Sequence, residues 1–286
     1  MVIRYKTGGM ITYYKNRENM DIMKKAAVLI LMAAVSVMAL AGCAKSGASK
    51  DEKSFTVGFD AEFPPYGYMD DKGEYVGFDL DLAQEVCNRK GWTLKKQPID
   101  WDAKDMELSS GAIDCIWNGF TIQGREDSYE WTIPYVDNSQ VFVTKSDSGI
   151  TKLSDLSDKR VGVQKDSSAL AALEGDSADL AGTFKELIQY EDYNTGFMDL
   201  EAGAIDALAI DIGVANYQIA KKGDGFIILD EQLASEQYGV GFLKGNTELK
   251  DEVEAVLKEM ADDGTILKIA KNYSDFGMEE SICIGK

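Results

Sequence analysis

The sequence predicts an α/β fold with a mostly parallel sheet, divided into two lobes around a ligand cleft. Strand-like and helix-like segments alternate from about residue 55 to residue 276, and a second alternating set begins after residue 150. Such alternation is typical of parallel α/β folds. The strand-like runs 139–145 and 238–243 stand where the chain would cross between the two sets. Two crossings form a hinge, and ligands favour the carboxyl ends of strands that face such a cleft.

In the first set, apolar residues at helical spacing make 78–90 the clearest element. Leu80, Ala83, Val86 and Cys87 fall on one face of this amphipathic helix. The other patterns predict a strand at 54–59, a hairpin within 66–76 that turns at Gly73, a strand at 94–99, a short helix at 105–110 that ends at Gly111, and a strand at 112–118.

The second set follows the strand-like run 139–145. It opens at 153–156, and the patterns predict strands at 160–164, 186–190 and 207–210 and helices at 168–173, 195–202 and 212–221. A strand at 238–243 would return the chain to the first set. Two helices at 247–262 and 265–273 finish the chain, with Gly264 expected as the C-cap between them.

The N-terminal segment predicts export. Lys24 and Lys25 precede an apolar run at 26–39 that is too short for a good membrane-spanning helix, and small residues follow it. Leu40-Ala41-Gly42-Cys43 resembles the lipobox of bacterial lipoproteins, whose cysteine takes a diacylglycerol, with acyl chains such as palmitate, and becomes the new N-terminus. An uncleaved anchor is the alternative. Residues 1–22 are either an over-called start or a long basic n-region.

We therefore expect a signal peptide at 1–42, a flexible lipidated tether at 43–53, one lobe from 54–140 and 239–286, and a second lobe from 141–238. This places the protein outside the cytoplasm, anchored to the cell membrane by lipid at Cys43.

Composition excludes several kinds of function. Without residues 1–42, the chain carries 24 basic and 47 acidic residues, a net charge of −23. We expect no nucleic-acid partner, because phosphate binding needs a basic surface. The chain has no histidine, which excludes His-based catalysis and His-containing metal sites. Beyond Cys43 only Cys87, Cys115 and Cys283 remain, and the first two are expected to be buried rather than bridged.

The segment 57–86 resembles the opening of the polar amino-acid family (family 3) of extracellular solute-binding proteins, which serve ATP-driven (ABC) importers. The matching motifs are Asp60-x-x-Phe63-Pro64-Pro65-Tyr66 and Gly77-Phe78-Asp79-x-Asp81-Leu82, followed in order by Ile113-Asp114, Asn118-Gly119-x-Thr121, Pro134-Tyr135, Val161-Gly162-Val163-Gln164, Ile205-Asp206-Ala207 and Tyr238-Gly239-x-Gly241. The resemblance implies a two-lobed, hinge-closing periplasmic-binding-protein fold of type II with an amino-acid site in the cleft.

A guanidinium suits the carboxylate of an amino acid because it pairs bidentately and keeps its charge when partly buried. Arg125 is the candidate, aided by the Thr121 hydroxyl, although the family's arginine usually lies one residue further from this threonine. A surface arginine paired with Glu126 or Asp127 is the alternative. Ser167 and Ser168 precede a helix and can cap it, and by resemblance they also contact the ligand carboxylate.

By resemblance, Asp211 and the Gly119 carbonyl receive the ligand's α-ammonium group. The other reading of Asp211 is a cap for the helix from Ile212. Phe63 and Trp101 match family positions whose rings enclose the ligand side chain, although either could be a core aromatic. Specificity would rest on Asp60, Glu62, Trp101, Asn118 and Gln164, and the sequence does not name the amino acid.

The leading hypothesis is a monomeric, lipid-anchored binding protein that captures a polar amino acid and delivers it to the transmembrane subunits of an ABC permease. We expect no catalytic residue, metal or cofactor. One alternative is an enzyme, because the fold resembles that of extracellular cyclohexadienyl dehydratases. The other is a ligand sensor that signals through a membrane receptor.

Overall fold

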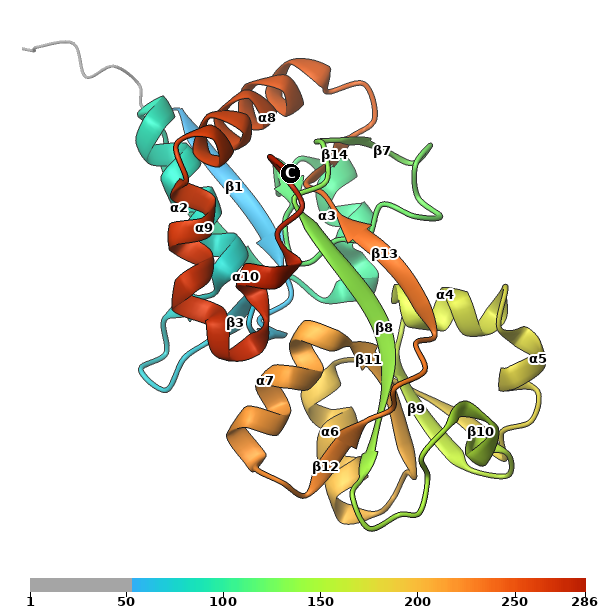
Figure 1. The fold of residues 1–286 in the computed structure, drawn as a ribbon. Coiled ribbons are helices and arrows are strands. Elements are labelled where there is room, and N and C mark those ends of the chain that lie inside the picture. Colours follow the sequence, from blue (N-terminus) through green and yellow to red (C-terminus); the bar gives the residue numbers. More distant parts are fainter. Residues whose placement is uncertain (1–52) are drawn as a thin grey trace, which may run out of the picture. The chain divides into compact units, whose positions relative to one another are not determined.

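The computed structural model describes residues 53–286, whose core is built on two β-sheets (Figure 1). Signal peptide, Cys43 and nearly all of the expected tether lie outside the described residues. The first sheet has the strand order β5-β1-β6-β14-β7, and the second has the order β10-β9-β11-β8-β12 with β13 paired to β8. We call the first sheet with its covering helices the first lobe, and the second sheet with its helices the second lobe.

The first lobe takes its elements from both ends of the described chain. Its strands are β1 (Ser54–Phe59), β5 (Thr93–Pro98), β6 (Cys115–Ile116), β7 (Tyr129–Trp131) and β14 (Gly241–Leu243), with a small sheet of β2 (Glu62–Phe63), β3 (Gly67–Met69) and β4 (Tyr75–Val76). Its helices are α2 (Phe78–Lys90), α3 (Lys104–Ser110), α8 (Thr247–Asp262), α9 (Thr265–Ala270) and α10 (Met278–Ser281), with 3-10 turns at Trp101–Ala103 and Lys271–Phe276.

The second lobe is continuous in sequence. Its strands are β8 (Val136–Lys145), β9 (Arg160–Gln164), β10 (Glu186–Tyr190), β11 (Ala207–Asp211), β12 (Phe226–Ile228) and β13 (Ala234–Tyr238). Its helices are α4 (Ser168–Glu174), α5 (Ala178–Ala181), α6 (Tyr193–Ala202) and α7 (Ile212–Lys222), with a 3-10 turn at Leu153–Leu156. Because β10, β9 and β11 run parallel, their carboxyl ends meet at one edge of the sheet.

Two antiparallel strands link the lobes. β8 and β13 pair from Val136 opposite Tyr238 to Gln140 opposite Ala234, and they run side by side between the lobes in Figure 1. The predicted single strand at 238–243 was wrong. The chain leaves β13 at Tyr238 and starts β14 at Gly241, where it joins the other sheet. An alternating apolar run does not reveal this break, because each half alternates normally within its own sheet. The residue boundaries of the lobes stay a prediction.

The other predicted elements agree closely with the structure, and 54–59, 78–90, 160–164, 186–190 and 247–262 match residue for residue. The predicted strand 112–118 is reduced to Cys115–Ile116, since only these residues pair with neighbours. The predicted helix 265–273 changes to a 3-10 turn after Ala270. Gly264 is the left-handed residue before α9, whereas the C-cap of α8 is Asp263.

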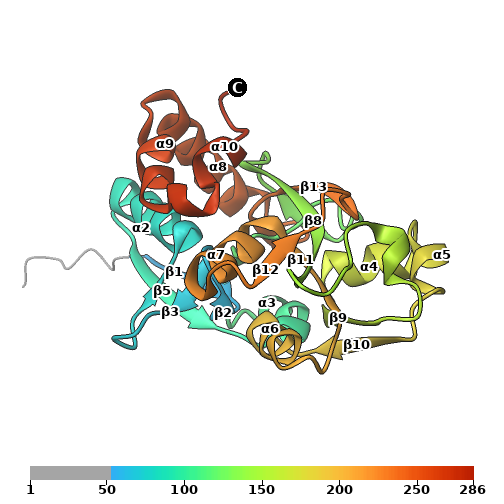
Figure 2. The ribbon, with the colours of Figure 1, turned by 60° about the horizontal axis from the view of Figure 1, so that its bottom comes forward.

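The two lobes are packed closely together in this conformation. Figure 2 shows α7 of the second lobe close to the C-terminal helices, and the Asn216 amide donates to the Phe276 carbonyl there. Cys87 and Cys115 are buried and unbridged, as expected, and Cys283 is partly buried and free. Within residues 53–286, no helix has the length and apolarity needed to cross a membrane.

Candidate functional site

A small cavity lies where the two lobes meet, and nine of the eleven residues predicted as ligand contacts line it. The two lobes leave only about 10 Å³ of free space there, about the room that one water molecule needs. In this conformation the lobes are therefore closed almost completely over the residues that line the cavity. The lining residues are Phe63, Trp101, Gly119, Thr121, Arg125, Gln164, Ser167, Ser168 and Asp211.

Gly119 forms the floor of the cavity on the first lobe, and only glycine fits there. Its φ is +54°, and a Cβ atom would lie 2.8 Å from the Phe63 ring and 3.0 Å from the Tyr238 ring. Its N–H donates to the Asp79 carboxylate at 2.6 Å, and Tyr135 donates to the same carboxylate at 2.8 Å. The Asp79 motif at the start of α2 therefore has a structural purpose, because its carboxylate fixes the backbone of the site.

Arg125 reaches across to the second lobe instead of pairing with a neighbouring acid. Its Nη2 donates to the main-chain carbonyl of Asp166 at 3.0 Å, and its guanidinium lies 5.3 Å from the Phe120 ring. The alternative, a surface ion pair between Arg125 and Glu126 or Asp127, is not found among the ion pairs of the described residues. The Thr121 hydroxyl donates to the Ser168 hydroxyl across the cleft at 3.3 Å.

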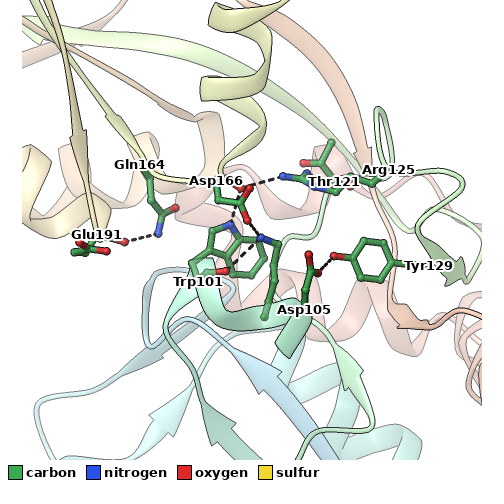
Figure 3. A network of polar contacts seen from close by, with 9 residues as sticks. Trp101, Asp105, Thr121, Arg125, Tyr129, Gln164, Asp166 and Glu191 are labelled. Carbon is green, nitrogen blue, oxygen red and sulfur yellow. Dashed lines mark hydrogen bonds and ion pairs between the residues drawn. The ribbon is translucent and has the colours of Figure 1, made fainter. Parts of the chain in front are cut away.

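Asp166 collects three donors from the first lobe (Figure 3). Its carbonyl accepts from Arg125 and, at 3.3 Å, from the Trp101 indole, while its carboxylate pairs with the Lys104 ammonium. Lys104 is only 2% exposed, which is unusual for a lysine and requires such a partner. Asp166 has a φ of +52°, in the left-handed region, where aspartate is tolerated better than most residues.

Ser167 caps α4 as predicted, because its hydroxyl accepts from the Leu170 N–H at 3.1 Å. Gln164, at the end of β9, forms a further bond between the lobes. Its amide donates to the Asp60 carboxylate at 2.8 Å and to the Glu191 carbonyl at 3.1 Å. Both lobes thus contribute polar groups to the wall of the cavity.

Asp211 is surrounded by donors from the hinge strands. Asn138 donates to it at 2.9 Å and Gln140 at 2.6 Å, and the Tyr238 hydroxyl also donates to it. Asp211 stands at the N-cap of α7 but makes no side-chain cap bond, so the capping alternative was wrong. The same two amides donate to Glu236, at 2.7 Å from Asn138 and 2.8 Å from Gln140.

Burial is the main cause of the raised pKa values of Asp60, Asp79 and Asp211. It raises the pKa of Asp211 to about 7, and the nearby Glu236 adds to this effect. Burial also raises the pKa of Asp79 to about 7 and that of Asp60 to about 6. The donors that surround each group oppose these increases. A cation that entered the cavity beside Asp211 would favour its ionised form.

Two predicted residues do not line the cavity. Asn118 is buried and turned toward the β3 backbone, since a Cβ on Gly67 would lie 2.6 Å from its Oδ1 atom. Asp60 lies behind Gln164, on the wall of a second cavity that shares Trp101 with the first. Glu62 lines this second cavity as well, together with Asp100, Asp102, Glu107, Glu191 and Asp192.

The sequence reasoning missed several residues around the site: Lys104, Asn138, Gln140, Asp166, Tyr193 and Glu236. Alternation along β8 is the one signal that pointed to any of them, because Asn138 and Gln140 place two amides on the same strand face as the apolar Val136 and Phe142. The remaining residues are brought to the site only by packing.

The arrangement supplies a guanidinium from one lobe and a carboxylate from the other at a single cavity. It can hold a molecule that has a negative and a positive group close together, with aromatic surface from Phe63 and Trp101 beside it.

Comparison with known proteins identifies the family. Residues 55–277 match the family model of the bacterial extracellular solute-binding proteins, family 3. The chain is 28% identical over 252 residues to the L-cystine-binding protein TcyJ of Escherichia coli K12, covering 85% of this chain and 91% of that protein. It is 28% identical over 260 residues to the arginine-binding extracellular protein ArtP of Bacillus subtilis, covering 87% and 98%.

A solved structure supports the same relationship. An ABC uptake transporter substrate-binding protein from Streptococcus pneumoniae, crystallised with bound histidine, is similar with a TM-score of 0.75 and 36% identity. The match covers 77% of this chain and 92% of that one. The two-lobed α/β fold is thus the periplasmic-binding fold of type II, as predicted. The chain belongs to the bacterial extracellular solute-binding proteins, family 3.

Proposed function

We propose that this protein captures a polar amino acid between its two lobes and delivers it to the permease of an ABC importer. The observation that carries the proposal is that Arg125 of the first lobe and Asp211 of the second lobe line the same cavity between the lobes. The relatives named for cystine, arginine and histidine bind molecules of this kind.

In this proposal the ligand carboxylate pairs with Arg125 and accepts hydrogen bonds from the hydroxyls of Thr121 and Ser168. The α-ammonium group pairs with Asp211 and donates to the Gly119 carbonyl. These assignments follow from charge complementarity, because a zwitterion leaves water only where both of its charges are compensated.

The ligand side chain would lie between Phe63 and Trp101 and extend toward Gln164. Beyond Gln164 it would meet Asp60 and the second, acid-lined cavity. A cationic or amide side chain is the best match for this end of the site, since both offer hydrogen-bond donors to the Asp60 carboxylate. Asn118 acts indirectly, by supporting the backbone beside Gly119.

Closure of the lobes completes the site. The groups around the cavity come from both lobes, so a ligand that bridges them favours the closed form over an open one. We place the hinge at β8 and β13, with the lobes at 54–140 with 239–286 and at 141–238. The closed form would be the one that the permease recognises, and lipid at Cys43 would hold the protein at the outer face of the cell membrane.

Ligand-dependent thermal unfolding of residues 44–286 tests the proposal. The twenty amino acids, cystine and ornithine are screened, and calorimetry follows on those that raise the melting temperature. A ligand at 100 times its Kd should add about 2.7 kcal/mol of stability. Arg125→Gln should abolish the effect, whereas Arg89→Gln, which removes a surface arginine paired with Glu85 and Asp263, should not.

The same experiment separates the alternatives. We propose that the protein binds its ligand without converting it, so prephenate and arogenate should remain intact in its presence. Turnover of either compound would favour the dehydratase-like reading. Absence of any response to amino acids would refute the proposed function.

A further inference from the structure

Glu236 is a buried acid next to the site that the proposed function does not use. It lies on β13, one of the two strands that link the lobes, and it is 6% exposed, while Asp211 is 3% exposed. Among the ion pairs of residues 53–286, neither acid has a lysine or arginine partner. Acidic side chains are almost never buried without a partner. The two acids therefore need another means of charge compensation.

Two side-chain amides connect Glu236 to Asp211. The Asn138 Nδ2 atom lies 2.9 Å from the Asp211 Oδ1 atom and 2.7 Å from the Glu236 Oε1 atom. The Gln140 Nε2 atom lies 2.6 Å from the same Asp211 oxygen and 2.8 Å from the same Glu236 oxygen. Because each nitrogen is within hydrogen-bond distance of both oxygens, the carboxylates are close enough for each charge to disfavour the other.

The other titratable groups around the two acids do not neutralise them. Tyr66 of the first lobe, Tyr193 of α6 and Tyr238 of β13 all interact with both acids. Burial is the main cause that raises the pKa of each phenol, and the two acids add to it, so all three stay neutral hydroxyls. Arg125 is the base among the residues that line the cavity with Asp211, and the proposed function assigns it to the ligand carboxylate.

A proton on Asp211 compensates the charge in the absence of ligand. Burial raises the pKa of Asp211 to about 7, and the charge of Glu236 adds to this increase. The proton removes the repulsion between the two acids. The ammonium group of a ligand brings a positive charge to the same carboxylate and favours its ionised form, so it makes the proton unnecessary.

We propose that Glu236 is a positioning residue of the ammonium site, which holds the Asn138 and Gln140 amides toward Asp211 and keeps a proton on Asp211 until the ligand's ammonium group replaces it. This inference rests on the proposed function and adds a regulation to it. The O–H bond of Asp211 breaks on binding, and the proton passes to a buffer base in the solvent. One positive charge leaves as another enters, so affinity falls in acidic medium.

The count of released protons tests the inference on the wild-type protein. Calorimetry in phosphate and in imidazole buffer at pH 6.5 gives this count, because the two buffers differ in their enthalpy of ionisation. The probe is the tightest binder among the amino acids other than histidine, whose own side chain titrates near this pH. Wild type should release about 0.8 proton per ligand, the fraction of Asp211 that a pKa of about 7 leaves protonated.

Glu236→Gln tests the part that Glu236 plays. The substitution removes the charge and keeps the size of the side chain and an oxygen that accepts from the two amides. Without the charge, Asp211 should lose its proton more easily. The midpoint of the pH profile of Kd should then move down by about one pH unit, and the release at pH 6.5 should fall to about 0.2 proton per ligand. A purely structural role would change stability or Kd and leave the midpoint in place.

Glu231→Gln is the matched control, five residues earlier in the same lobe. Glu231 is exposed, and its carboxylate accepts from the Leu153 N–H at 2.7 Å. This variant should keep the wild-type midpoint and proton count. An unshifted midpoint in Glu236→Gln would overturn the inference while the proposed function stands. A wild type that binds its amino acid without releasing a proton would also overturn it, even if the Glu236→Gln variant did not fold. If the wild type bound no amino acid, the proposed function would fail and this inference with it.

Discussion

The ion pair between Lys104 and Asp166 should help to hold the lobes closed. The Lys104 ammonium comes from the first lobe and the Asp166 carboxylate from the second, so the pair exists only when the lobes meet. Asp166→Asn removes the charge and keeps both the side-chain shape and the tolerance for a φ of +52°. The main-chain carbonyl that receives Trp101 and Arg125 remains, so the substitution isolates the ion pair.

The expected loss of stability on breaking the ion pair follows from how exposed Lys104 and Asp166 are. Fully exposed pairs contribute about 0.2–1 kcal/mol, whereas removal of one partner from a buried pair costs about 3–5 kcal/mol. Here the Lys104 side chain is 2% exposed and the Asp166 side chain 54% exposed, which places the pair between these cases. We expect Asp166→Asn to destabilise the closed form by about 1–2 kcal/mol and to raise the ligand Kd about 5- to 30-fold.

Stopped-flow and calorimetric binding provide the assay. The increase in Kd should appear mostly in the dissociation rate, because the pair acts after the ligand has entered. Asp158→Asn is the control, since Asp158 is an exposed second-lobe aspartate that also has a positive φ, +60°. Equal Kd values for the Asp166→Asn variant and wild type would refute the reasoning. So would an equal loss of affinity in the Asp158→Asn control.

Four further predictions concern the site and the expected signal peptide with Cys43. Asp211→Asn should raise Kd about 100-fold or more and leave ligand-free stability unchanged or higher, because it removes a buried charge; calorimetry and melting curves check both effects. Asp79 and Asp211 have pKa values of about 7 in the folded protein, against 3.8 in the unfolded chain. Between pH 4 and pH 7 the unfolded chain therefore loses protons that the folded protein retains. The contribution of these two acids to the free energy of unfolding should consequently fall as the pH rises through this range. Ligand binding needs ionised Asp211, so Kd should rise roughly 10- to 30-fold between pH 7.5 and 5.5, and a flat profile would contradict the ammonium assignment. Cys43→Ala should move the protein from the membrane fraction to the soluble fraction of fractionated cells, and retention in the membrane would favour an uncleaved anchor.

Most of the site could be predicted because its residues stand at recognisable places in the chain. Gly119, Gln164, Ser167 and Asp211 lie at or just beyond strand ends, and parallel strands bring such ends to one edge. Asn118 does not line the cavity, because one residue along a strand end turns a side chain to the other face. Its amide lies against Gly67, whereas its neighbour Gly119 lines the cavity.

The surroundings of Asp211 could not be predicted in the same way. Asn138 and Gln140 lie about seventy residues before Asp211 in the chain, and Glu236 lies after it on another strand. Gln140 faces Asp211 and Asn138 faces Glu236 because of the pairing register of three strands. A shift of one residue would turn these side chains to the opposite face. No local pattern specifies that register.

The sequence by itself determined the elements, the family resemblance and the two charged ends of the site. Period-2 and period-3.6 patterns, capping residues and glycines at left-handed positions act over a few residues, so they can be read along the chain. Only the tertiary structure decided that the run 238–243 divides between two sheets, that Asp166 receives Lys104, and that Tyr193 lies beside Asp211. These features depend on strand register and on the contact between the lobes. Both result from many interactions between residues that are far apart in the sequence.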